Sequence, residues 1–207
     1  MIRRDGCHNL EDKDHLVCVD FDGTLIKVDS GRIYLLYFAG LKIRFLGATR
    51  KLHLIGKNYF RKQLLVSIVE FRGSYPERYA EFLVLLKKNI NSQLVALLSY
   101  YEKSGHMIIV NSTSEEDLVR DVCSNLEVSY TIGSNKHRLN YGPEKINALI
   151  TVFPNSKIKY CVGISDNSDD DLWLDYFETF VKIDPRVELE ISKLVTNKSC
   201  EKLISNP

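Results

Sequence analysis

The chain has 207 residues, 44% of them hydrophobic and 27% charged, which is typical of one globular domain or of one domain that carries an insertion. Its 28 Lys and Arg residues balance 27 Asp and Glu residues, so no bulk charge indicates nucleic acid or a membrane as a partner. No apolar run approaches the roughly 20 residues of a membrane-spanning helix, and the first residues lack the apolar core of a signal peptide. The five cysteines are scattered without a CxxC pair, so we expect reduced thiols and a cytoplasmic protein.

The first predicted strand ends in two closely spaced carboxylates. Residues 16–19 are apolar and β-prone, and Asp20 and Asp22 follow them before a Gly-Thr turn. Side chains alternate between the two faces of a strand, so both carboxylates can point the same way while the residue between them packs on the other side. Two carboxylates held together repel each other. Their pairing indicates a bound cation or a reaction, with a solvated acidic loop as the alternative.

The next segment, residues 31–104, contains few strand signals and several helical ones. Apolar side chains recur at helical spacing over residues 34–45 and again over 64–71. A Gly-Ser-Tyr-Pro break then precedes a predicted helix over 77–88, and a further helix is predicted over 92–103. The sequence therefore predicts a helical insertion directly after the first strand.

From residue 106 onward, predicted strands and helices alternate. The strands are expected over 107–110, 128–132, 158–164 and 179–183, and the helices over 115–125, 143–152, 170–176 and 186–194. Alternation of this kind is typical of an α/β protein whose mostly parallel sheet carries helices on both faces. The strand over 16–19 is expected at the centre of that sheet.

The stretch Val-Cys-Val-Asp-Phe-Asp-Gly-Thr-Leu resembles the first motif of the haloacid dehalogenase-like (HAD) hydrolase superfamily. The resemblance implies that Asp20 is a nucleophile that takes a phosphoryl group and that Asp22 is the general acid and base. The residue types suit this chemistry, because a carboxylate can attack phosphorus and a neighbouring carboxylic acid can protonate the leaving oxygen. Mg²⁺ is the expected cofactor, since it prefers carboxylate and phosphate oxygens. Its implied ligands are Asp20, the backbone carbonyl of Asp22 and a third acid further along the chain.

The resemblance implies that a hydroxyl and a lysine follow, each near the carboxyl end of a strand, where open α/β sheets bind their ligands. Ser112 is the candidate to bind a phosphate oxygen, with Thr113 as its nearest competitor, and Ser114 is expected to be the N-cap of the next helix. Lys145 matches the Gly-x-x-Lys segment that opens a helix. Its charge would offset the negative charge gathered around the nucleophile and the phosphate.

The last implied group is a carboxylate after another strand, and Asp166 is the candidate metal ligand. The sequence departs here from the common Gly-Asp-Ser-x-x-Asp form, because Ser165 stands where Gly is usual and Asn167 replaces Ser. A supporting acid is expected at Asp170 or Asp171, and we favour Asp170. The alternative for this acidic run is a solvated loop that caps a helix.

The resemblance is to the phosphoserine-phosphatase-like branch and implies a Rossmann-like core with an all-helical cap of the C1 type. The core would comprise residues 1–28 and 105–207, and the cap residues 29–104. Asp29 would either contact a substrate group or cap the first cap helix, and Arg72 would bind a substrate carboxylate through its planar fork.

We therefore expect a Mg²⁺-dependent phosphatase that hydrolyses a small-molecule phosphomonoester through an aspartyl-phosphate, with no nucleic-acid partner. Three alternatives stay open: a phosphotransferase or mutase of the same superfamily, a catalytically degenerate binding protein, and a signalling receiver domain. The basic, apolar stretch over residues 41–57 also leaves open a membrane surface or a lipid phosphate as a partner.

Overall fold

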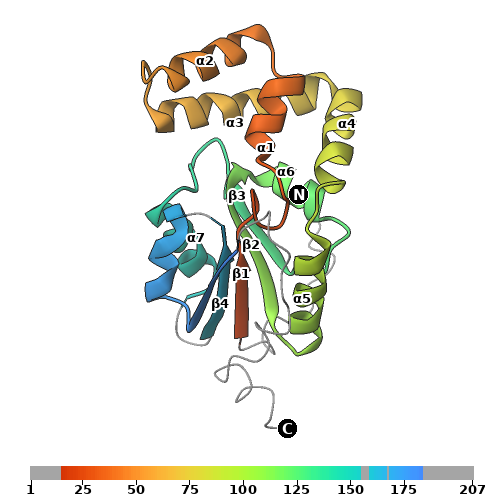
Figure 1. Ribbon diagram of the computed structural model, residues 1–207, viewed down its shortest axis with the longest axis vertical. Helices are drawn as coiled ribbons and strands as arrows, with labels where there is room; N and C mark the ends of the chain where they lie inside the picture. Colours follow the sequence, from red (N-terminus) through yellow and green to blue (C-terminus); the bar gives the residue numbers. More distant parts are fainter. Residues whose placement is uncertain (1–14, 155–158, 167, 184–207) are drawn as a thin grey trace.

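A computed structural model describes residues 15–154, 159–166 and 168–183 (Figure 1). The helix predicted over 186–194 lies outside the described residues. Among the described helices, none is both long enough and apolar enough to cross a membrane.

Five parallel strands form one sheet in the order β3-β2-β1-β4-β5. Their bounds are β1 His15–Val19, β2 Met107–Glu115, β3 Tyr130–Ser134, β4 Lys159–Ser165 and β5 Thr179–Lys182. The first strand lies at the centre of the sheet, and the predicted α/β fold is confirmed. The continuous apolar run of β1 is explained by burial on both faces, which is the usual situation of a parallel sheet.

The two faces of the sheet carry separate hydrophobic clusters, and β1 contributes alternate residues to each. Val17 and Val19 pack with α5 (Ser92–Lys103) and α6 (Glu116–Cys123). On the other face, Leu16 and Cys18 pack with α7 (Pro143–Val152) and with the short 3₁₀ helix η3 (Ser168–Asp175). The period-2 alternation of a strand thus places helices on both sides of the central strand.

A group of helices stands above one end of the sheet, at the top of Figure 1. Its members are α1 Ser30–Ile33, the π-helical turn η2 Tyr34–Phe38, α2 Leu41–Lys51, α3 Lys57–Ser74 and α4 Pro76–Lys87. We call this group the cap. Helix α5 runs beside the strands and contacts β2, so the helices above the sheet end with α4 and not at residue 104.

Several predicted boundaries agree with the structure, and one differs in a way that matters for the site. The helices expected over 92–103 and 143–152 have those bounds, because Asn91 caps the first and Pro143 begins the second. By contrast, β2 continues to Glu115, and α6 begins only at Glu116. The carboxylate of Glu115 accepts a hydrogen bond from the backbone N–H of Leu118 at 2.8 Å and so caps this helix in place of Ser114.

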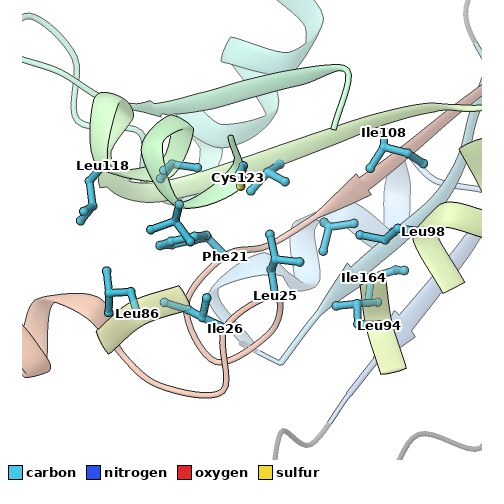
Figure 2. Close-up of a cluster of buried hydrophobic side chains, with 14 of the residues drawn as sticks. Phe21, Leu25, Ile26, Leu86, Leu94, Leu98, Ile108, Leu118, Cys123 and Ile164 are labelled. Atoms are coloured by element: carbon cyan, nitrogen blue, oxygen red, sulfur yellow. The ribbon is translucent and has the colours of Figure 1, made fainter. Parts of the chain in front are cut away.

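The loop after β1 is anchored in the core by its apolar side chains. Figure 2 shows Phe21, Leu25 and Ile26 among side chains of α4, α5 and α6. All three side chains are fully buried. The loop that carries Asp20 and Asp22 is therefore held by packing on the side away from the carboxylates.

Candidate active site

A buried lysine joins two carboxylates at the carboxyl end of the sheet. Lys145 Nζ lies 2.7 Å from Asp20 Oδ1 and 2.9 Å from each carboxylate oxygen of Asp170. All three residues are at most 4% exposed. Ser165 Oγ donates a hydrogen bond to Asp170 Oδ2 at 2.7 Å and orients that carboxylate. The end of β1, the first turn of α7 and η3 meet at this point.

The charges of this cluster do not balance, because two buried carboxylates share one ammonium. Burial, opposed by Lys145, raises the pKa of Asp20 to about 7, and the charge of Asp170 adds to the rise. Burial lowers the pKa of Lys145, but Asp20 and Asp170 together raise it above its ordinary value. Lys145 is therefore held as a cation, and its single charge can compensate only one of the two acids that it contacts.

Asp22 is bonded to polar groups from the cap and from β2. Its Oδ1 accepts a hydrogen bond from the backbone N–H of Ser30 at 2.6 Å, and its Oδ2 accepts one from Ser114 Oγ at 2.5 Å. Burial and the charge of Asp29 raise the pKa of Asp22 to about 6. Ser114 is thus an orienting group for Asp22 and not the helix cap that its position predicted.

The end of β2 carries the two hydroxyl residues that the sequence offered as phosphate ligands. Ser112 is 1% exposed, and its Oγ accepts a hydrogen bond from the N–H of Ser114 at 3.0 Å. Both Ser112 and Thr113 line the cavity that Asp20 and Lys145 line, so both hydroxyl candidates share a cavity with the nucleophile candidate.

A buried asparagine that sequence reasoning missed braces this arrangement. Asn140 Nδ2 lies 2.7 Å from the carbonyl oxygen of Ser112 and 2.7 Å from Asn111 Oδ1. Asn111 Nδ2 in turn donates to the carbonyl of Lys145 at 2.9 Å. The two amides therefore tie β2 to the first turn of α7. No local pattern marks Asn140, because it lies in an irregular segment before that helix.

Asp166 lies against the turn that follows β1. Thr24 Oγ1 donates to Asp166 Oδ1 at 3.1 Å and accepts from the Asp166 N–H at 3.0 Å. A Cβ atom on Gly23, whose φ is +75°, would lie 2.1 Å from Asp166 Oδ2, so only glycine allows this approach. Burial raises the pKa of Asp166, against the effect of the Thr24 hydrogen bond. The Gly-Thr turn thus positions an acid 142 residues away in the chain.

The two acids proposed to support the last motif have different surroundings. Asp170 is buried against Lys145, as described above, whereas Asp171 is exposed and pairs with Lys182 at 3.1 Å. The geometry therefore favours Asp170.

The two weaker substrate candidates have partners within the protein. The Asp29 side chain accepts a hydrogen bond from the N–H of Arg32 at 2.8 Å, so it caps α1, although it also lines the cavity. Arg72 lies 3.0 Å from a Glu115 carboxylate oxygen and 2.5 Å from one of Asp117. Its guanidinium joins α3 to the start of α6, and Arg72 is not among the residues that line the cavity described below.

A cavity of about 540 Å³ separates the cap from the core. The core side of its lining includes Asp20, Asp22, Ser112 and Lys145, which the structure brings together as the sequence predicted. Among the described residues, no three His, Cys, Asp or Glu side chains converge as a metal-binding cluster. The groups that could contribute to a metal site are the carboxylates of Asp20 and Asp166 and the backbone carbonyl of Asp22.

Neither a protein-family profile nor a curated protein sequence matches the chain. Solved structures do resemble it. A Bordetella pertussis Tohama I protein of unknown function is 11% identical, with a TM-score of 0.62 over 90% of this chain and 96% of that one. A HAD family hydrolase from Salmonella enterica serovar Typhi is 10% identical, with a TM-score of 0.59 over 80% of this chain and 60% of that one. A phosphoserine phosphohydrolase-like protein from Francisella tularensis is 16% identical, with a TM-score of 0.52 over 88% and 93%. These likenesses show that the chain has the fold of HAD-family hydrolases.

Proposed function

We propose, from the HAD-hydrolase fold and the geometry of the site, that the protein is a Mg²⁺-dependent phosphatase of a small-molecule phosphomonoester. The observation that carries the proposal is the buried contact of Lys145 with Asp20 at 2.7 Å, on the floor of a cavity that Asp22 and Ser112 also line. A perturbed, buried carboxylate in a cavity with a convergent cation and hydroxyl is the arrangement expected of a reactive site.

In the first half of the proposed reaction, a carboxylate oxygen of Asp20 attacks phosphorus and the bond from phosphorus to the ester oxygen breaks. Asp22 gives its proton to the departing oxygen, and its pKa of about 6 keeps part of the population protonated near neutral pH. Ser112 and Lys145 bind the phosphoryl oxygens. Positioning and charge stabilisation are the main contributions that such a reaction needs.

In the second half, the aspartyl-phosphate on Asp20 is hydrolysed. Asp22, now ionised, takes a proton from water as the water oxygen attacks phosphorus, and the bond to Asp20 breaks to release inorganic phosphate. Ser114 Oγ and the Ser30 N–H hold the Asp22 carboxylate in place for both transfers. Asp170 and Ser165 keep Lys145 oriented toward the nucleophile.

The donor set fits Mg²⁺, which binds through one or two carboxylates together with phosphate oxygens. Asp20, Asp166 and the Asp22 carbonyl would hold the ion. When bound, it would offset the charge of the phosphoryl group and of the surplus carboxylates. The surplus of acidic groups over cations around Asp20 supports this assignment.

The test is the Asp20→Asn variant, assayed for phosphate release from para-nitrophenyl phosphate with Mg²⁺. We expect release to be lost, because an amide is a far weaker nucleophile than a carboxylate. Asp175→Asn, the same change at an exposed acid of η3, is the matched control and should retain the wild-type rate. Retained turnover in purified Asp20→Asn would reject the assignment.

The assay also separates the alternatives. Phosphate transfer to an added alcohol in place of water would favour a phosphotransferase, and no turnover over a broad panel would favour a degenerate binding protein. We also propose a cytoplasmic location, since the described cysteines, Cys18, Cys123 and Cys161, are buried thiols.

A further inference from the structure

The charge of the cap differs from that of the whole chain. Between Asp29 and Glu70 the sequence contains no Asp or Glu, while the formal net charge of the chain is only +1. The eight basic residues of this stretch are Arg32, Lys42, Arg44, Arg50, Lys51, Lys57, Arg61 and Lys62. Such a concentration of one sign raises the local concentration of ligands of the opposite sign.

Most of this charge lines the cavity above the reaction centre. The cap cations that line it are Arg32, Arg50, Lys51, Lys57 and Arg61. The helices of the cap add no carboxylate to the lining, and Asp29, directly before α1, is the acid nearest to them in the chain that lines it. The side of the cavity that the cap forms, which we call the roof, is therefore strongly cationic. The opposite side, which the core forms, holds the candidate site for the reacting phosphoryl group.

Three cations of this basic roof have no acidic partner in the part of the chain that the structure describes. Among the described residues, Arg32, Arg50 and Lys51 have no carboxylate within salt-bridge distance. The exposed Arg120, by comparison, pairs with Asp117 one turn away, so acids elsewhere on the surface are used for this purpose. Cations that face one cavity repel each other, and a bound anion would remove that repulsion.

The rest of the roof is attached to the core beside the reaction centre. Lys57 Nζ donates to Tyr141 Oη at 2.8 Å, and the Arg61 guanidinium lies 3.5 Å from the centre of the Tyr141 ring. Tyr141 precedes the helix that carries Lys145. An anion bound by the roof would thus be held in a defined place relative to Lys145.

Lys145 and the proposed Mg²⁺ site lie at the core side of the cavity, where the reacting phosphoryl group would bind, so the cap cations are additional to the groups that bind it. Resting on the phosphatase activity proposed above, we propose that the substrate is a polyanionic phosphomonoester, with at least one phosphate beyond the one that reacts. A cavity of about 540 Å³ has the size of ordinary small-molecule sites. The additional phosphate binds the cap cations, which contact it by charge-assisted hydrogen bonds.

The experiment compares substrates that differ in phosphate number. Initial rates of phosphate release and calorimetric affinities are measured with inositol monophosphate and with inositol trisphosphate. The test variant is Arg32→Gln with Arg50→Gln, and the control variant is Lys42→Gln with Lys62→Gln. The control removes the same charge from the cap at positions that do not line the cavity. The same release assay is repeated with phosphatidylcholine vesicles that carry phosphatidylinositol bisphosphate, so that a lipid-bound headgroup is compared with the soluble esters.

We expect the wild type to prefer the trisphosphate, and the test variant to lower the trisphosphate-to-monophosphate ratio of kcat/KM roughly tenfold, as for the loss of charged hydrogen bonds. The control variant should keep the wild-type ratio. Faster phosphate release from the vesicle would identify a membrane lipid as the source of the phosphorylated headgroup. Faster release from the soluble ester would identify a free polyphosphate as the substrate.

No preference in the wild type, or equal losses in the two double variants, would overturn the inference. Tight trisphosphate binding that depends on Arg32 and Arg50, with no phosphate release from either inositol phosphate or from para-nitrophenyl phosphate, would reject the phosphatase proposal while supporting the polyanion site.

Discussion

At the scale of single residues, the site contains more buried acids than buried cations. Lys145 contacts both Asp20 and Asp170, whereas Asp22 and Asp166 are bonded to hydroxyl groups. Burying a charge is tolerated only where a partner compensates it. These acids therefore depend on one ammonium, on hydroxyl donors and on any cation that the cavity binds.

Replacing Lys145 by Met should destabilise the protein and abolish phosphate release. The variant leaves Asp20 and Asp170 buried together without a cation, so we expect the free energy of unfolding near neutral pH to fall by about 3 kcal/mol. The loss should shrink as pH falls below about 7, the raised pKa of Asp20, because this buried carboxyl then binds a proton. The control is Lys182→Met, which breaks the exposed pair with Asp171 and should cost under about 1 kcal/mol. Equal losses in urea unfolding of the two variants would contradict the buried pairing.

Replacing Asp22 by Asn should stabilise the metal-free protein at neutral pH. The folded pKa of Asp22, about 6, is above its ordinary value of 3.8, so its contribution to stability is present in acid and lost as pH rises through the folded pKa. We expect Asp22→Asn to exceed the wild type by roughly 1–3 kcal/mol above that pH and to match it near the ordinary pKa. Thermal unfolding with a chelator, followed over this range, measures the difference. A constant offset at every pH would exclude titration of Asp22 as its cause.

At the scale of elements, the turn after β1 connects sequence-distant parts of the site. Its apolar residues Phe21, Leu25 and Ile26 are buried, while Gly23 and Thr24 hold Asp166 from the end of β4. The turn thus holds Asp166 against the loop that carries Asp20 and Asp22. A local change there should have consequences for both stability and metal-dependent activity.

Gly23→Ala tests this dependence. The new Cβ would meet the Asp166 carboxylate and would also be placed in the left-handed region, so we expect a stability loss well above the roughly 1–2 kcal/mol of left-handed strain alone. Gly105→Ala is the control, because Gly105 has a φ of +85° and no atom within 4 Å of the added Cβ. Activity at saturating Mg²⁺ should fall for Gly23→Ala and persist for Gly105→Ala. Similar behaviour of the two variants would show that Asp166 is not held by this turn.

At the scale of the whole molecule, one hydrophobic cluster extends from the sheet into the cap. Its members include Val19 of β1, Leu86 of α4 and the cap residues Tyr34 and Ile68. A shared core usually unfolds as one unit. The cap and the sheet should therefore lose structure together and not in separate steps.

Trp173 provides the measurement, because it is the single tryptophan of the chain and is buried in the cluster that packs on Leu16 and Cys18 of β1. We expect its fluorescence and the far-ultraviolet circular dichroism of the helices to change at the same urea concentration. An earlier loss of helical signal would indicate that the cap melts independently.

Much of the architecture could be predicted from the sequence because the signals are local. The apolar run before Asp20, the alternation of strands and helices after residue 106, and Pro143 at the start of a helix each follow from short-range patterns. The order of acid, hydroxyl, lysine and acid along the chain also predicted which residues meet at the end of the sheet. Parallel strands bring their carboxyl ends to one edge whatever lies between them.

Only the tertiary structure decided how those residues are paired. Ser114 bonds Asp22 and leaves the helix cap to Glu115, Asp170 and not Asp171 reaches Lys145, and Arg72 is used by Glu115 and Asp117. Each outcome depends on which side chains are close across long sequence separations and on which charges must be compensated when buried. A single sequence records residue types and spacing, whereas the competition among neighbouring donors and acceptors is resolved only when the chain packs.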